Sequence, residues 1–283
     1  MPKSMLISGA SSGVGKALSL GLDKLGYRVF AGVRKDEDAE TLRSQASPQL
    51  TPLILDITQP EAIAAACEHI AQTTRGGLFC LINNAGVSYS GAMEFMPMED
   101  FRQQMEVNLF GQLALTQACL PLLRQERGRV LFISSVDVRL ATAYNGPYSC
   151  SKAALVAMAD ALRLELSPWG IAIVVLILGS VRTPIWEKAA QTAGEILRRA
   201  PAEAWNMYGK YQKQAGRFYQ QAGLHGMDVN ELVPIVHRVL QSRNPKPYLL
   251  VGKDALIFEL MAKLLPVRWR DWQVLRQMGL HNL

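Results

Sequence analysis

Short apolar runs alternate with helix-period segments along most of this chain, and that alternation restricts the possible folds more than any other feature. Between the first two runs, for example, Val14, Leu18, Leu22 and Leu25 recur at helical spacing. The runs are rich in Val, Ile and Leu, which is typical of parallel strands buried on both faces. The predicted strands are residues 4–8, 28–33, 51–55, 79–83, 129–134, 171–177 and 246–251.

Two longer helices are predicted beside the later strands, from residue 97 to about residue 123 and over residues 148–166. The chain has 283 residues without repeats or a long linker, which favours one domain over residues 1–283. The sequence therefore predicts an α/β fold of the Rossmann type. We expect a doubly wound, mostly parallel seven-stranded sheet with helices on both faces.

The alternation stops after Thr183-Pro184. Residues 185–227 are predicted to form polar helices, and these carry the aromatic residues Trp186, Trp205, Tyr208, Tyr211, Phe218 and Tyr219. Such helices either pack on the edge of the sheet or form a lid over an apolar substrate. Residues 255–283 are interpreted as a helical extension, amphipathic over 255–280. We expect it to dock on the domain or contact another subunit, in preference to binding a membrane surface.

Composition and charge exclude several classes of protein. Hydrophobic residues make up 49% of the chain and charged residues 19%, which excludes general disorder. The formal net charge is +6, but residues 198–283 alone hold 13 Lys and Arg against six Asp and Glu. This uneven excess does not form a general nucleic-acid-binding surface. It indicates a solvated surface or, as the alternative, a site for an anionic partner.

Cysteine and histidine usage gives no sign of a disulfide framework or a metal site. The four cysteines and four histidines lack ligand spacing: Cys67, Cys80, Cys119, Cys150, His69, His225, His237 and His281. We expect buried free thiols in a reducing compartment. The chain shows no secretory signal or membrane-spanning run, so the predicted location is cytoplasmic.

A glycine-rich turn joins the first predicted strand to the first helix. It reads Ser8-Gly9-Ala10-Ser11-Ser12-Gly13-Val14-Gly15, with the spacing G-x-x-x-G-x-G. Its glycines permit positive φ and close approach of the backbone to a ligand, and the following helix presents free N–H groups to a pyrophosphate. The turn therefore predicts a dinucleotide site. Its candidate contacts are Gly9, Ser11, Ser12, Gly13, Val14 and Gly15.

The residues after the second strand bear on which dinucleotide binds. An acid there usually holds a 2′-hydroxyl, whereas an arginine suits a 2′-phosphate. Here the strand is followed by Arg34 and Lys35, which favours NADP(H). The acidic residues 36–38 would oppose a nearby phosphate, and Arg34 can also be read as a solvated strand end. NAD(H) therefore stays possible.

Ser135, Tyr148 and Lys152 form a second constellation. Tyr148 and Lys152 are four residues apart at the start of a helix and so share one face. A phenol's ordinary pKa near 10 is too high for acid–base work at neutral pH, but a neighbouring ammonium and an oxidised nicotinamide favour phenolate and lower that pKa. Ser135 ends a buried strand, where its hydroxyl can hold a substrate oxygen.

From Lys3 to about Pro184 these motifs resemble the single-domain short-chain dehydrogenase/reductase family. The resemblance rests on the glycine turn, Asn83-Asn84-Ala85-Gly86, Ile133-Ser134-Ser135 and Tyr148-Ser149-Cys150-Ser151-Lys152. It implies that Tyr148 is the proton donor or acceptor and that Ser135 orients the substrate oxygen. It also implies that Lys152 binds the nicotinamide ribose and tunes Tyr148, and that Asn108 holds a water linked to Lys152.

The resemblance also implies further cofactor contacts. Asp56 and Ile57 resemble the adenine-contacting pair, and Gly179, Val181 and Thr183 resemble the segment that holds the carboxamide. The remaining implied contacts are Asn83, Ala85, Gly86, Tyr148 and Lys152. The chain departs from the family at Ser8, Val138 and Leu178, where threonine, glycine and proline are common. These changes affect local geometry and leave the reacting groups in place.

The expected function is an NADP(H)-dependent oxidoreductase that interconverts a small apolar ketone or aldehyde with its alcohol. The sequences of residues 29–35 and 169–184 are similar to those of the retinol and hydroxysteroid dehydrogenase branch of the family. An NAD-dependent alcohol dehydrogenase is therefore one alternative. A non-catalytic NADP(H)-binding interaction protein is another. By family resemblance the helices at 97–123 and 148–166 would pair across subunits in a homodimer or homotetramer.

Overall fold

The computed structural model describes residues 2–75 and 77–281. In these residues seven strands form one sheet in the order β3-β2-β1-β4-β5-β6-β7, and each neighbouring pair is parallel. The strands are β1 (Ser4–Ile7), β2 (Arg28–Val33), β3 (Leu50–Ile54), β4 (Cys80–Asn83), β5 (Arg129–Ser135), β6 (Ala172–Leu178) and β7 (Tyr248–Val251). The predicted fold class is confirmed, and the strand ends differ from those predicted by at most two residues.

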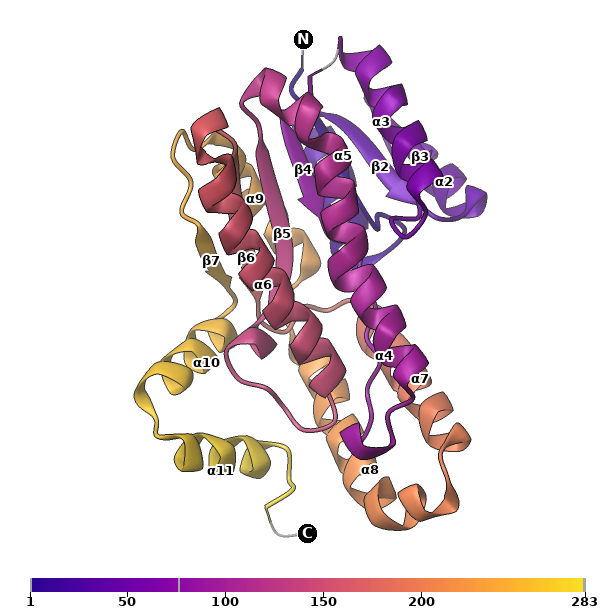
Figure 1. Ribbon diagram of the computed structural model, residues 1–283, viewed down its shortest axis with the longest axis vertical. Helices are drawn as coiled ribbons and strands as arrows, with labels where there is room; N and C mark the ends of the chain where they lie inside the picture. The colour runs from indigo at the N-terminus through magenta and orange to yellow at the C-terminus, as the bar shows by residue number, and fades with distance from the viewer. Residues whose placement is uncertain (1, 76, 282–283) are drawn as a thin grey trace.

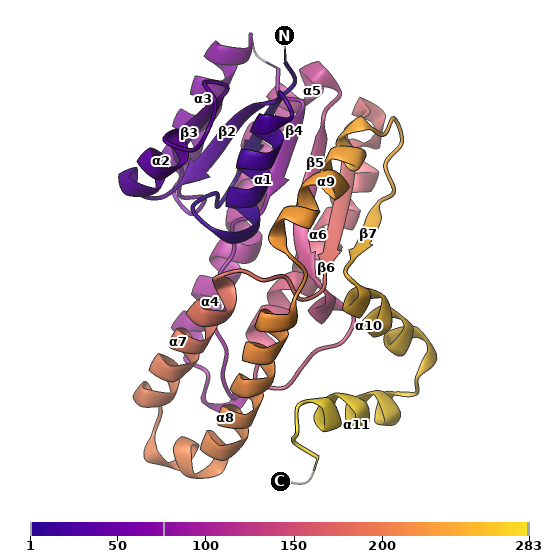
Figure 2. The ribbon, with the colours of Figure 1, turned by 180° about the vertical axis from the view of Figure 1, so that it is seen from behind.

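The sheet carries a separate hydrophobic core on each face, because successive strand residues point to opposite sides. On β1, Met5 and Ile7 belong to one core and Leu6 to the other. The first core is covered by α1 (Gly13–Lys24), α2 (Asp36–Arg43) and α9 (Leu232–Gln241), and the second by α3 (Pro60–Thr74), α5 (Gly111–Glu126) and α6 (Gly146–Leu166). Figures 1 and 2 show these two helical layers from opposite sides.

The helix predicted from residue 97 to about 123 is interrupted. It consists of α4 (Met98–Met105), a π-helical turn over Glu106–Phe110, and α5, which together form one continuous helical path. The turn holds the fully buried Asn108. Single π-helical turns inside α-helices occur frequently at functional sites, because the extra residue per turn re-aims one side chain.

The predicted lid segment forms two helices, α7 (Ile185–Arg199) and α8 (Ala202–His225). They extend away from the sheet beyond the ends of its strands (Figures 1 and 2). Both ends of this excursion are held together at its base. The backbone N–H of Met227 donates to Ser180 O at 2.9 Å, and that of Arg182 donates to Met227 O at 3.0 Å.

The C-terminal extension contains two helices where the sequence predicted one. They are α10 (Lys253–Leu264) and α11 (Val267–Gln277), separated at Leu265-Pro266. Leu265 has extended backbone, with φ −91° and ψ 135°, because the ring of a following proline disfavours helical geometry. In the described part of the chain, each helix is too short or too polar to cross a membrane.

The cysteines are free thiols, but they are not all buried as predicted. Cys80 and Cys119 are buried, whereas Cys150 is exposed on α6. Cys67 Sγ lies 3.7 Å from Cys119 Sγ. Within residues 2–75 and 77–281, His, Cys, Asp and Glu side chains do not gather into groups of three that could hold a metal ion.

Candidate active site

The glycine-rich turn lies between β1 and α1 at the carboxyl end of the sheet. Gly9 has φ +68° and Gly13 has φ +55°, which L-residues with a side chain rarely adopt. A Cβ on Gly9 would also lie 2.8 Å from the Cα of Ala85. The turn borders an open cavity of about 1000 Å³, lined here by Gly9, Ser11, Ser12, Gly13 and Val14.

Gly15 contributes to the shape of the turn without lining the cavity. A Cβ at Gly15 would lie 2.2 Å from the carbonyl oxygen of Gly9, so a side chain would force the turn apart. Asn84 ties the same turn to the end of β4, since its Nδ2 donates to Ser8 O at 2.9 Å and to Gly9 O at 3.0 Å. Ser8 Oγ in turn accepts from the backbone N–H groups of Asn84 and Ala85 at 3.1 Å.

The two consecutive asparagines after β4 have different surroundings. Asn83, a predicted cofactor contact, is fully buried and donates to Thr116 Oγ1 on α5 at 2.8 Å, away from the cavity. Asn84 lines the cavity, as do Ala85 and Gly86. The structure therefore places Asn84 where the sequence analysis had assigned Asn83.

The far end of the cavity lies at the ends of β2 and β3. Arg34, Asp56 and Ile57 line it there, as predicted for the adenosine end of a dinucleotide site. Asp56 accepts hydrogen bonds from the backbone N–H of Thr58 at 2.9 Å and from its hydroxyl at 2.8 Å. These bonds fix the carboxylate, while Arg34 is exposed at the cavity edge.

Gly179, Val181 and Thr183 line the opposite wall after β6. A residue from the C-terminal extension positions this segment: Asp254 at the start of α10 accepts from the backbone N–H of Ser180 at 2.6 Å. A Cβ on Gly179 would lie 1.9 Å from Asp254 Oδ1. The close packing of Gly179 on Asp254 therefore requires glycine, and the sequence analysis assigned no role to Asp254.

Ser135, Tyr148 and Lys152 meet at the inner part of the same cavity. Ser135 ends β5, and Tyr148 and Lys152 lie one turn apart near the start of α6. Lys152 is 4% exposed, and its Nζ donates to Ile133 O at 2.9 Å and lies 5.7 Å from the centre of the Tyr148 ring. These three side chains, predicted from sequence spacing, are thus brought together.

Asn108 lies behind this group and does not line the cavity. Its Oδ1 accepts from the backbone N–H of Val87 at 2.8 Å, and its Nδ2 donates to Val87 O at 2.9 Å and to Ser151 Oγ at 3.0 Å. A Cβ on Gly86 would lie 3.3 Å from Asn108 Oδ1 and 3.8 Å from Lys152 Nζ. Asn108 is therefore close to Lys152, with its amide already bonded to protein groups.

Burial controls the titration of the reacting residues. It lowers the pKa of Lys152 to about 8, and the carboxylate of Asp137 opposes that change. Burial and the charge of Asp137 raise the pKa of Tyr148, while a hydrogen bond with Ser135 lowers it. The sequence analysis expected a lowered phenol pKa. The groups of the protein itself instead raise the pKa of Tyr148, so its side chain is a neutral phenol at neutral pH.

A family model described as short chain dehydrogenase matches residues 3–194, more than half of the chain and all of the glycine turn, Ser135, Tyr148 and Lys152. The chain belongs to the short-chain dehydrogenase family. Two relatives of known name cover nearly all of it. It is 34% identical over 280 residues to the 17-beta-hydroxysteroid dehydrogenase type 6 of Bos taurus, covering 97% of this chain and 88% of that one. It is 35% identical over 276 residues to human retinol dehydrogenase 5, covering 94% and 86%.

A solved structure agrees with this family membership. The short chain dehydrogenase from Burkholderia cenocepacia, determined in complex with NADP, is 26% identical, with a TM-score of 0.71. The superposition covers 93% of this chain and 94% of that one. This short-chain dehydrogenase is therefore an oxidoreductase with a Rossmann-type nucleotide-binding fold, as the sequence analysis predicted.

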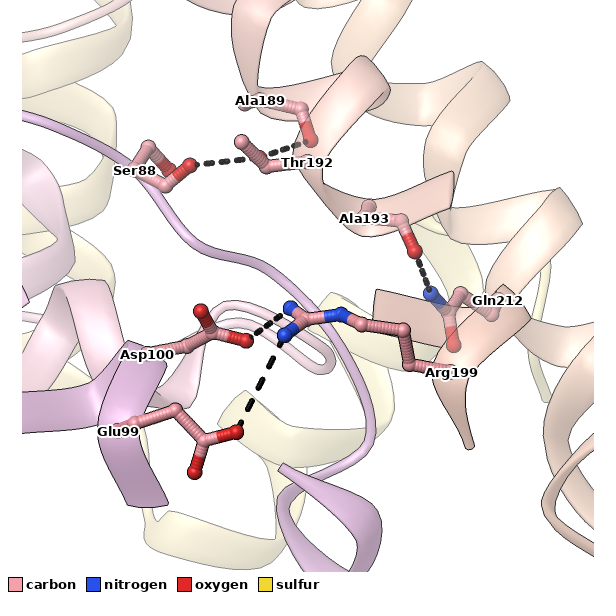
Figure 3. A network of polar contacts seen from close by, with 8 residues as sticks. All are labelled: Ser88, Glu99, Asp100, Ala189, Thr192, Ala193, Arg199 and Gln212. Carbon is pink, nitrogen blue, oxygen red and sulfur yellow. Dashed lines mark hydrogen bonds and ion pairs between the residues drawn. The ribbon is translucent and has the colours of Figure 1, made fainter. Parts of the chain in front are cut away.

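In this short-chain dehydrogenase α7 crosses in front of the cavity and is bonded to the body of the domain. Figure 3 shows Arg199 at the end of α7 paired with Asp100 on α4 and, at 4.0 Å, with Glu99. Higher on α7, Thr192 Oγ1 donates to Ser88 O at 3.0 Å. Exposed ion pairs stabilise by at most about 1 kcal/mol, so these contacts hold α7 in place without locking it.

On α8, Tyr219 lines the cavity and bonds the loop after β5. Its hydroxyl lies 2.7 Å from Thr142 Oγ1 and 2.8 Å from Ala143 O, and its one proton can be donated to either of these oxygens. Its ring stacks on Trp186, with the centres 6.5 Å apart, and Trp186 Nε1 donates to Val181 O at 2.8 Å. The predicted helices within residues 185–227 are thus present, and they contact the loop after β5 and the segment after β6. Residues of both helices line the cavity.

Proposed function

We propose that this short-chain dehydrogenase is an NADP(H)-dependent reductase that converts an apolar ketone or aldehyde to its alcohol. The observation that carries the proposal is the meeting of Ser135, Tyr148 and Lys152 at the inner end of a cavity whose other end is the glycine turn. An elongated cavity of this kind suits a dinucleotide at one end and a reacting carbonyl at the other.

The residues present fit a nicotinamide dinucleotide. The turn has positive φ at Gly9 and Gly13, lines the cavity and leads into the N-terminal, positive end of α1, which suits a pyrophosphate. Val181 and Thr183 provide the wall for the nicotinamide, and Lys152 has its ammonium within the same inner region. When bound, the nicotinamide would supply the hydride, a proton with two electrons, to the carbonyl carbon.

The chain's own residues supply the proton. Tyr148 gives its phenolic proton to the carbonyl oxygen as the carbon gains the hydride, so that C=O becomes CH–OH. Burial and Asp137 raise the pKa of Tyr148, so the phenol holds at neutral pH the proton that reduction consumes. Ser135 orients the oxygen, and the ammonium of Lys152 stabilises the phenolate that remains until a proton from solvent replaces the one transferred.

Preference for NADP(H) is supported by the surroundings of Arg34. This exposed arginine lines the cavity directly after β2, where its guanidinium can pair with a 2′-phosphate. Among the described residues, the acidic side chains 36–38 are outside the cavity lining. They form the first turn of α2, where negative charge stabilises a helix N-terminus. These acidic residues therefore stabilise the start of α2, and it is Arg34 that faces the cavity.

An apolar substrate is supported by the walls of the inner cavity. Trp186 and Tyr219 close it from the lid, and Leu178 and Val136 line it from the sheet. The relatives are named for hydroxysteroids and retinol, which are bulky and apolar. An NAD-dependent alcohol dehydrogenase of that type is the alternative, and it differs from our proposal in cofactor and direction.

Cofactor titration followed by turnover tests the proposal. NADPH should bind more tightly than NADH, and Arg34→Ala should remove most of that difference. Arg43→Ala, an exposed arginine on α2 that pairs with Glu40, should keep it. The loaded enzyme should then reduce apolar ketones or aldehydes. Equal or tighter NADH binding would favour the alternative, and binding without hydride transfer to any carbonyl or alcohol would indicate a non-catalytic binding protein.

A homodimer or homotetramer is also proposed. Phe110 beside α5 and Leu164 on α6 are 53% and 68% exposed, and the predicted subunit contact uses these helices. Covering such side chains is favourable at about 25 cal/mol per Å² of apolar surface. Light scattering on the eluting protein should give twice or four times the chain mass, and a monomer would contradict the proposal.

A further inference from the structure

A carboxylate lies next to the reacting residues, and the proposed reduction does not require it. Asp137 follows β5 two residues after Ser135 and lines the inner cavity. The Ser135 hydroxyl donates a hydrogen bond to Asp137 Oδ2 at 2.7 Å. Thr142 Oγ1 and Asn145 Nδ2 donate to the other oxygen, Oδ1, at 3.2 and 3.3 Å.

Each of these bonds to Asp137 comes from a neutral group. In the described part of the chain no Lys, Arg or His nitrogen lies within ion-pair distance of it. A carboxylate partly removed from water is costly unless a cation pairs with it. Burial accordingly raises the pKa of Asp137, and its hydrogen bonds with Ser135, Thr142, Asn145 and its own backbone act against that change. Oδ2, with Ser135 as its one side-chain donor, has room for a further donor.

The other acidic residues of the cavity are in different places. Asp56 is at the adenosine end, where both of its hydrogen bonds come from Thr58. Glu187 is exposed on α7. Asp137 is therefore the carboxylate at the reacting end, and a cationic group of the substrate can pair with it there.

We infer that the substrate carries an amino group on the carbon next to the reacting carbon, and that Asp137 binds this group as its ammonium. The inference rests on the proposed function, and it names the substrate class: an α-amino ketone, reduced to a vicinal amino alcohol. The hydride goes to the carbonyl carbon and the Tyr148 proton to its oxygen. The ammonium is unchanged.

The distances suit such a substrate. A carbonyl oxygen bonded to Ser135 Oγ is no more than about 5.5 Å from Asp137 Oδ2, which is itself 2.7 Å from Ser135 Oγ. An amino nitrogen on the adjacent carbon lies about 2.8 Å from that oxygen, which leaves about one hydrogen-bond length to Oδ2. One small group can therefore contact Asp137 while its neighbour contacts Ser135.

An ammonium also resolves a conflict over the one proton of Ser135. Without a ligand, Ser135 donates that proton to Asp137 and cannot give it to a substrate oxygen as well. An ammonium with three N–H donors and a full charge replaces Ser135 at Oδ2, and the hydroxyl is then free to orient the carbonyl. A substrate without the amine must compete with the carboxylate for Ser135.

Three alcohols of equal chain length test the inference in the direction of oxidation: a long-chain vicinal amino alcohol, the vicinal diol, and the plain secondary alcohol. We expect the wild type to favour the amino alcohol over the plain alcohol by about 10- to 100-fold in kcat/KM, the worth of a hydrogen bond to a charged group. In Asp137→Asn this ratio should fall by at least about tenfold. The ratio removes any effect of the variant that is common to both substrates.

Asp271→Asn is the matched control, because Asp271 is exposed on α11 and its substitution should leave the ratio unchanged. Calorimetry gives a readout independent of turnover, and the amino alcohol should bind the wild type more tightly than the plain alcohol does. No preference in the wild type, or an equal loss on both substrates in Asp137→Asn, would overturn the inference. A preference for the diol over the amino alcohol would overturn it too.

Absence of turnover with all three alcohols and their ketones would reject the proposed function instead. Calorimetry on the wild type would then still measure whether the cavity prefers the amine. Equal binding of the amino and plain alcohols would reject the ammonium site separately. Because the wild-type comparison needs no variant, poor folding of Asp137→Asn would not prevent a decision.

Discussion

Asn108 and Lys152 are at most 4% exposed, whereas Trp205 on α8 and Trp269 and Trp272 on α11 are 58%, 68% and 51% exposed. The first pair belongs to the part of the chain that builds the sheet, and the tryptophans belong to the helices after residue 184. In the sheet region polar groups are buried and hydrogen-bonded, and in the C-terminal helices large apolar groups are left at the surface. The reacting groups thus lie in the sheet region, and the helices after residue 184 add side chains such as Trp186 and Tyr219 to the wall of the cavity.

The largest expected effect is the loss of catalysis in Tyr148→Phe. Removing one hydroxyl should lower kcat by about 10²- to 10⁴-fold, the usual contribution of an acid–base group, while NADPH affinity changes little. Tyr27→Phe is the matched control, since the Tyr27 hydroxyl faces His237 outside the cavity. Comparable loss in both variants would show that Tyr148 supports the fold and not the reaction.

Phe132→Ala should produce the largest loss of stability. Phe132 on β5 is fully buried, and truncating such a ring costs about 3–5 kcal/mol in the free energy of unfolding. Denaturant titration monitored by circular dichroism measures this. A loss below about 1 kcal/mol would mean that neighbouring side chains move into the space left by the ring. The core of the sheet region would then be less tightly packed than its burial indicates.

The buried Lys152 gives the apoprotein a distinctive pH dependence. Its pKa is about 8 in the fold and 10.5 ordinarily, so between these pH values the unfolded chain holds a proton that the folded chain has lost. Stability therefore rises through this window, by up to about 3 kcal/mol, and the full penalty is present below about pH 8. In unfolding titrations across this range, the free energy of unfolding of the wild type should rise relative to that of Lys152→Met, because the raised pKa values of Cys80 and Tyr148 act equally on both proteins.

Tyr219→Phe tests how strongly the lid depends on its hydroxyl contact. Loss of the hydrogen bonding to Thr142 and Ala143 should cost about 1 kcal/mol, seen as a several-fold rise in KM with NADPH affinity unchanged. Tyr208→Phe is its control on the same helix, because the Tyr208 hydroxyl bonds Glu94 on the outside. An equal rise in KM for both variants would mean that α8 acts as a whole.

Trp269→Ala should have the smallest effect. The side chain is 68% exposed, and substitutions at such positions usually change the free energy of unfolding by no more than about 0.5 kcal/mol. The same denaturant titration compares it directly with Phe132→Ala. A cost near that of Phe132→Ala would show that α11 is covered in solution, for instance by another subunit.

Most of the sheet and the reacting residues could be predicted from sequence, because both depend on local pattern. Apolar runs gave the strands, and a four-residue spacing placed Tyr148 and Lys152 on one helical face. The period of two along β4 could also have separated Asn83 from Asn84, since Asn83 shares the side of Leu81, whose core lies under α5.

Other features depend on tertiary contacts that no local pattern carries. Asp254 reaches Ser180 across 74 positions of sequence, and it is brought there because β7 pairs with β6. The raised pKa of Tyr148 follows from burial and from Asp137, neither of which spacing reveals. The break before Pro266 did have a sequence signal, and the amphipathic pattern on either side of it obscured that signal.

The backbone bonds that join Ser180 and Arg182 to Met227 fasten both ends of the lid at one point. A change of length or composition between these ends can leave β6 and α9 in place, provided that the contacts of the lid with Asp100, Ser88 and Thr142 are kept or replaced. New substrate ranges can therefore arise by exchange of the lid, while the hydride and proton chemistry beneath it is inherited intact.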